Sequence, residues 1–200
     1  SEATLQHSWA TLQPSLSPTK ANVSVETTLD ATVNHPITTY YWTLPNGSTM
    51  TTSDGKLDYT FEQRDNSANV DVILEDIRGE NKTTTATVDV GDSIPPMLRV
   101  TANRSTAELG VETVQFNASR STDNDRIDQY KWNFGDGTST TTDPVVNRTY
   151  TSRGSKTLTL TATDAVGNSN VTTTNVEIVD TIKPTPLVTA PESTVVGDQI

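Results

Sequence analysis

The sequence predicts an all-β protein made of two tandem β-sandwich domains without disulfides. Three observations support this prediction: apolar residues alternate with polar ones at the period of a strand, the pattern recurs once along the 200 residues, and the chain has no cysteine. Only 32% of the residues are hydrophobic and 6% aromatic, so each core must be thin. About a fifth are Thr, which suits exposed strand faces because it is β-branched yet polar.

The repeat is clearest around two tryptophans. The segment YYWTLPNG at 40–47 matches YKWNFGDG at 130–137, which places Trp42 and Trp132 90 positions apart. Asp76 and Asp164, each followed by a glycine three residues later, lie 88 positions apart. We therefore expect two modules of similar length, with Trp42 and Trp132 as equivalent core residues on equivalent strands.

Each repeat reads as a series of short strands at hairpin spacing. In the second repeat, four expected strands each turn alternate residues inward: Val114, Phe116 and Ala118; Tyr130, Trp132 and Phe134; Leu158, Leu160 and Ala162; Val176 and Ile178. A Trp in an early central strand that faces a later alternating strand is typical of an immunoglobulin-like sandwich. The Gly-Asp-Gly at 135–137 predicts a tight turn in which the Asp136 carboxylate accepts backbone N–H groups.

The domain boundaries follow from the repeat and from proline-containing connectors. We expect an N-terminal extension at 1–17, a divergent domain at 18–92, a second domain at 93–180, and a linker with the first strand of a third repeat at 181–200. Proline in the connectors favours stiff, extended links and hence a rod. The tail at 187–200 matches 98–110, which leaves two readings open: a longer array, or strand exchange between copies with 1–17 as the reciprocal partner.

The second repeat resembles the PKD (polycystic kidney disease-type) family of Ig-like domains. The resemblance rests on VQFNASRSTDNDRID at 114–128, YKWNFGDG at 130–137 and LTLTATDAVG at 158–167, although Lys156 stands where the family usually has an aromatic residue. The first repeat is similar only loosely, because Leu-Pro-Asn-Gly replaces Phe-Gly-Asp-Gly. The resemblance implies an extracellular spacer or assembly role, as in surface-layer proteins, adhesin stalks and accessory modules of secreted proteases and chitinases, with no activity of its own.

Calcium is the metal that the residues of the second repeat suggest. Hard oxygen donors recur at alternate positions from Ser119 to Asp128, and Ca²⁺ takes six to eight oxygen ligands. We therefore centre a candidate calcium site on Asp123 and Asp125, against the alternative of an Asp-rich turn without an ion. The first repeat has Val33 and His35 at the aligned positions, so only the second should bind calcium.

The residues do not indicate catalysis, and we predict neither an enzyme nor a cofactor beyond calcium. The two histidines are His7 and His35, and no Gly-x-Ser-x-Gly motif accompanies them. The pair Asp123 and Asp136 lies in turns, where Asp is favoured for its own backbone hydrogen bonds.

The surface chemistry predicted from the sequence is acidic and rich in glycosylation motifs. The net charge of −11 argues against a nucleic-acid partner, and no apolar run is long enough to span a membrane. Seven asparagines begin an Asn-x-Ser/Thr motif, which the high Thr content alone also explains: Asn22, Asn46, Asn81, Asn103, Asn117, Asn147 and Asn170.

Together these observations predict a non-catalytic extracellular module at the cell surface. It would serve as a rod-like spacer or building block of a surface layer, stalk or filament, with neighbouring copies, adjacent domains or glycans as partners. The alternative is an accessory region of a secreted hydrolase that binds polysaccharide or protein polymers, for which exposed aromatics in a planar row would be the signature.

Overall fold

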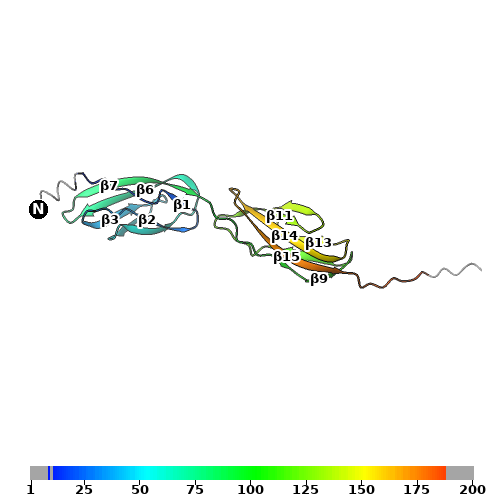
Figure 1. Cartoon of the computed structure of the whole chain (residues 1–200). Helices are drawn as coiled ribbons and strands as arrows, with labels where there is room; N and C mark the ends of the chain where they lie inside the picture. The colour runs from blue at the N-terminus through cyan, green and yellow to red at the C-terminus, as the bar shows by residue number, and fades with distance from the viewer. Residues whose placement is uncertain (1–8, 10, 188–200) are drawn as a thin grey trace, which may run out of the picture.

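The computed structural model describes residue 9 and residues 11–187, which form two all-β modules placed end to end (Figure 1). The part of the chain described has no helix long and apolar enough to cross a membrane. The expected strand of a third repeat falls almost wholly on residues 188–200, outside the described residues.

The first module consists of seven strands in two sheets. They are β1 (Lys20–Asn22), β2 (Glu26–Asp30), β3 (Ile37–Thr43), β4 (Thr49–Thr52), β5 (Lys56–Thr60), β6 (Asp65–Asp76) and β7 (Asn81–Gly91). One sheet has the order β1-β7-β6-β3-β4, and β2 pairs with β5 to form the other. Strand β1 runs parallel to β7, whereas the other pairs are antiparallel.

The second module repeats this arrangement with one additional short strand. Its strands are β8 (Thr101–Ala102), β9 (Thr106–Glu108), β10 (Thr113–Asn117), β11 (Ile127–Asn133), β12 (Thr138–Thr141), β13 (Val145–Thr149), β14 (Gly154–Asp164) and β15 (Ser169–Val179). The sheets have the orders β12-β11-β14-β15-β9 and β13-β10-β8. The parallel β9–β15 pair matches the parallel β1–β7 pair. Strands β3 and β11 also share a register shift between their first and third residues, where they pair with β6 and β14. This confirms the predicted fold class of two Ig-like sandwiches.

The two tryptophans occupy equivalent core positions, as predicted. Trp42 on β3 and Trp132 on β11 both have no exposed surface, and each lies opposite an aliphatic residue of the next strand, Val72 and Leu160 respectively. Each module has its own hydrophobic cluster between its sheets. Because no disulfide joins the sheets, the burial of these large side chains is what holds each sandwich together.

The turn after β11 differs in detail from the expectation for Asp136. The Asn133 side-chain oxygen accepts the Gly135 N–H at 3.0 Å, while Asp136 pairs with Arg148 at 2.9 Å. The Arg148 guanidinium also lies 5.2 Å from the centre of the Phe134 ring. Asp136 therefore ties this hairpin to β13, and the turn-capping role that we expected of it is filled by Asn133.

The segment before β1 packs on the first module. Leu16 is buried in the first core, and Ser17 exchanges two backbone hydrogen bonds with Asp30, at 2.9 and 2.7 Å. The Trp9 ring lies against the His35 ring, with 4.9 Å between the ring centres. Part of the predicted extension at 1–17 thus belongs to the first module, while residues 1–8 and 10 lie outside the described residues.

Candidate metal centre at the junction of the modules

The two modules meet through a short connector and side chains of the loop between β10 and β11. The Asn124 amide donates to the Val23 carbonyl and to the Asp92 carboxylate, both at 3.0 Å. Asp125 forms an ion pair with Arg64 of the first module, with 3.0 Å between Nε and Oδ2. Asn168 adds a bond from its amide to the Asp92 carbonyl, at 3.3 Å. The second module therefore holds the connector and the end of the first module by several polar contacts.

Three carboxylates converge at this junction. Asp92 follows β7 at the start of the connector, Asp123 lies in the loop between β10 and β11, and Asp164 ends β14. One oxygen from each lies within 4.8 Å of the others. Among the described residues no Lys or Arg forms an ion pair with any of the three, so their charges have no cationic partner in this part of the chain.

Two of the carboxylates present buried oxygens without a hydrogen-bond donor. These are Asp92 Oδ2 and Asp123 Oδ1, and the neighbouring amide oxygen of Asn124 is in the same state. A buried polar oxygen without a partner costs free energy, and a carboxylate costs more than a neutral group. Clustered hard oxygens are the ligands that Ca²⁺ prefers. The donor set therefore fits a divalent cation, which these three aspartates could ligate.

The pKa shifts of two cluster members have opposite directions. Burial raises the pKa of Asp123, and the charges of Asp92 and Asp164 raise it further. Burial opposes ionisation of Asp164 too, but hydrogen bonds from the Asn168 side chain and from the backbone N–H groups that follow outweigh it, so the pKa of Asp164 lies below its usual value. Asp164 is thus held ionised, and a cation would relieve the repulsion that Asp123 experiences.

The sequence-based calcium site is placed only in part at this cluster. Asp123 is a member, whereas Asp125 turns its carboxylate to Arg64 and donates its backbone N–H to Asp123 Oδ2 at 3.0 Å. Asp92 and Asp164 were missed, because they are 31 positions before and 41 positions after Asp123. A signal was present for both, since Asp164 repeats Asp76 and the exit sequence at Asp92 recurs at Asp180.

His35, the histidine in the described part of the chain, lies in a closed environment. The side chain of His35 is 2% exposed, with Nε2 3.9 Å from Asp76 Oδ2 and the ring against Trp9. A substrate has no access to an imidazole covered in this way. His7 lies outside the described residues.

The glycosylation motifs are spread over both modules. Five of the asparagines are exposed: Asn46, Asn81, Asn103, Asn147 and Asn170. Asn22 and Asn117 are partly buried, and the Asn22 oxygen accepts bonds from the N–H and hydroxyl of Ser93 at the junction. The Asn170 amide donates to the Pro96 carbonyl at 3.0 Å, so a sugar on Asn170 would compete with a contact to the connector.

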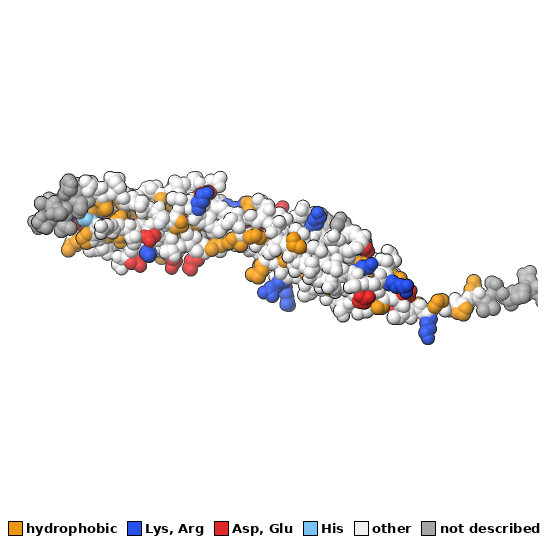
Figure 2. Space-filling model, viewed as in Figure 1, with side chains coloured by type: hydrophobic (Ala, Val, Ile, Leu, Met, Phe, Trp, Pro, Cys, Tyr) orange, Lys and Arg blue, Asp and Glu red, His pale blue; other side chains and the backbone are white. Residues whose placement is uncertain are grey.

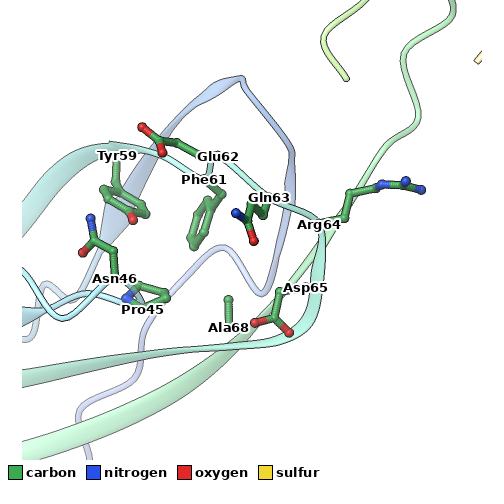
Figure 3. Close-up of a pocket in the computed structure, with 9 residues that line it drawn as sticks. All are labelled: Pro45, Asn46, Tyr59, Phe61, Glu62, Gln63, Arg64, Asp65 and Ala68. Atoms are coloured by element: carbon green, nitrogen blue, oxygen red, sulfur yellow. The ribbon is translucent and has the colours of Figure 1, made fainter. Parts of the chain in front are cut away.

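A shallow pocket of about 340 Å³ lies on the first module beside the junction (Figure 3). Tyr59 and Phe61 form one side, in an edge-to-face contact with 4.8 Å between ring centres. Figure 3 shows Arg64 extending away from the pocket, which agrees with its ion pair to Asp125. The other residues that line the pocket are mostly exposed loop side chains, and none of its lining residues is a histidine or cysteine that could act as a base or nucleophile.

Comparisons with known proteins support the identity of the second module. The family model described as "PKD domain" matches residues 93–179. A comparison with curated proteins gives no match. Among solved structures, the PKD1 domain of the Vibrio cholerae metalloprotease PrtV is 32% identical and is covered in full by 44% of this chain, with a TM-score of 0.37. The PKD1 domain of Vibrio anguillarum Epp is 25% identical, with 99% of it and 44% of this chain covered and a TM-score of 0.38.

A structure described under carbohydrate-binding modules of the β-sandwich superfamily is 32% identical, with a TM-score of 0.42. The match covers 44% of this chain, which spans only 36% of that protein. PKD and Ig-like domains are generally non-catalytic modules. Residues 93–179 are therefore identified as a PKD domain by the family model that matches them.

Proposed function

We propose that this chain is a non-catalytic, rod-forming segment of an extracellular protein, in which Ca²⁺ at Asp92, Asp123 and Asp164 stiffens the junction between sandwich modules. The observation that carries this proposal is the origin of the three ligands. Asp92 belongs to the connector, while Asp123 and Asp164 belong to the second module. One ion bound to all three would therefore tie the connector to the module that follows it.

The end-to-end placement of the modules supports a spacer role (Figure 1). The termini of the described chain lie at opposite ends, so further modules could continue the same line. Asp180 repeats Asp92 in the exit sequence of the second module, which would equip the next junction with the same connector ligand. Neighbouring modules of the same surface protein are thus the partners that we propose.

The surface favours this role over binding of an insoluble polymer. On the face shown in Figure 2, most of the surface is uncharged and polar, with hydrophobic side chains in small separate groups. Tyr41, at 39%, is the one aromatic among the exposed large hydrophobic residues of the described chain. A flat polymer surface is usually met by several exposed rings, which this chain does not present in its described part. We accordingly expect no retention on cellulose, chitin or collagen in a pull-down assay, and clear retention would favour the alternative.

The stiffening role is tested by small-angle X-ray scattering on the whole chain. With Ca²⁺ we expect a narrow distribution of lengths that matches the extended arrangement, because the ion holds Asp92 against the second module. With a chelator, or in Asp123→Asn with Ca²⁺ present, the distribution should broaden as the junction bends.

Asp128→Asn is the matched control, since Asp128 is the second residue of β11, close after the loop that holds Asp123, and its side chain is 60% exposed. It removes the same charge and should behave as the unaltered protein. Scattering that is insensitive to both chelation and Asp123→Asn would contradict the proposed stiffening.

A further inference from the structure

Asp76 in the first module and Asp164 in the second occupy the same structural position. Each ends the long strand β6 or β14, and the two are 2% and 3% exposed. In both, Oδ1 accepts backbone N–H groups of the second and fourth residues that follow, at 2.8–3.0 Å. In both, the Asp N–H donates to the carbonyl of the fourth residue, Glu80 or Asn168, at 3.0 Å. The two sites thus share one backbone framework.

The second residue after each aspartate makes the difference between the sites. In the first module it is Arg78, whose Nε and Nη2 lie 3.0 and 2.9 Å from Asp76 Oδ2. In the second module it is Val166, which brings no charge. Asp164 Oδ2 instead accepts a bond from the neutral Asn168 amide at 2.7 Å. An Arg–carboxylate pair with two contacts supplies both charge and geometry, and a neutral amide supplies only the hydrogen bond.

The neighbours of the two aspartates also differ in charge. Beside Asp76 lie the His35 imidazole and, over it, the Trp9 ring. Beside Asp164 lie Asp92 and Asp123, with their unpartnered buried oxygens. The first site therefore has a built-in cation, Arg78, which contacts Asp76 and also the exposed Glu80 carboxylate at 3.0 Å. The second site has three carboxylates and, among the described residues, no paired cation.

We propose that the Arg78 guanidinium is the first module's internal counterpart of the cation that the junction site takes up. On this view the site at Asp76 is complete without a metal ion, whereas the site at Asp164 depends on one. This inference rests on the proposed function for the identity of the cation, but the equivalence of Arg78 and Val166 can be tested without any metal. The arginine makes the first module's stability independent of Ca²⁺ and confines the response to the junction.

The test transfers the arginine to the second module. Val166→Arg should place a guanidinium beside Asp164, where it can neutralise part of the acidic cluster. We expect its second module to melt at a higher temperature than that of the unaltered protein in chelator, and its gain on adding Ca²⁺ to fall by at least half. Scanning calorimetry of the whole chain measures both, and hydrogen exchange of peptides from β7 and β14 assigns each change to its module.

Val171→Arg is the matched control, because Val171 is an exposed valine on β15, 55% exposed against 46% for Val166. It adds the same charge outside the turn and should leave both melting temperature and Ca²⁺ response unchanged. The reciprocal variant Arg78→Val should destabilise the first module with or without Ca²⁺, because the buried Asp76 carboxylate loses the guanidinium that contacts its Oδ2.

The outcomes separate the two proposals. If the unaltered protein shows no Ca²⁺ response but Val166→Arg is stabilised in chelator, the metal role fails and the arginine equivalence stands. If the unaltered protein responds to Ca²⁺ but Val166→Arg gains nothing in chelator and responds in full, the equivalence is overturned. The equivalence is likewise overturned if Arg78→Val leaves the first module as stable as before.

Discussion

Replacing Trp132 with alanine is expected to lower the free energy of unfolding of the second module by about 3–5 kcal/mol. The Trp132 ring has no exposed surface and lies between the two sheets, in contact with the cluster that includes Leu160 and Phe116. Its removal leaves a cavity that the surrounding strands can close only in part. Small domains are stable by about 5–15 kcal/mol, so the variant should be near the limit of folding at ambient temperature.

Denaturant unfolding followed by circular dichroism or calorimetry measures the loss for each module. Trp42→Ala should produce the same loss in the first module and leave the second unchanged, because the cores are separate. Lys131→Ala is the control on the same strand, since its side chain is exposed and should change stability by less than about 0.5 kcal/mol. A Trp132→Ala variant with undiminished stability would be inconsistent with this core.

Replacing Asp123 with asparagine is expected to act in opposite directions with and without calcium. In calcium-free buffer near neutral pH the variant should be more stable than the unaltered protein. The reason is that burial and the charges of Asp92 and Asp164 disfavour the ionised form of Asp123, and asparagine carries no charge. In Ca²⁺ it should lose the gain that the ion provides. At a free Ca²⁺ concentration a hundred times Kd, that gain is about 2.7 kcal/mol.

The pH dependence of the calcium-free protein follows from the direction of the pKa shift. The pKa of Asp123 is raised in the folded state above the ordinary value of 3.8, so the folded protein binds the proton more tightly than the unfolded chain. The contribution of Asp123 to stability is therefore favourable at low pH and is lost as the pH rises from 3.8 through the folded value. Asp123→Asn should remove this part of the pH profile.

Melting temperatures measured between pH 3 and pH 7, with chelator and with Ca²⁺, check both statements. Asp128→Asn, at the exposed start of β11, again serves as the control. If Asp123→Asn lowers the stability without calcium, or keeps the full gain with calcium, the assignment of Asp123 as a ligand is wrong.

The fold followed from the sequence because strands leave a local signature. The alternation of Tyr130, Trp132 and Phe134 with polar neighbours requires that one face of β11 be buried, and the recurrence at Trp42 requires a second copy of the same sheet. The order of the strands in each sheet and their register were not predicted and come from the structure. The turn after β11 was less well predicted, since Asn133 and Asp136 have similar turn propensities and only their neighbours separate their roles.

By itself, the sequence determined the all-β class, the two repeats, the core tryptophans and the membership of Asp123 in an oxygen-rich loop. Only the tertiary structure decided which carboxylates join Asp123. Asp92 and Asp164 reach it through the connector and the end of β14, and Asp125 is drawn away by Arg64 of the other module. The physical reason is range: strand patterns arise from neighbours along the chain, whereas a cation site requires oxygens within a few ångströms that only chain folding brings together.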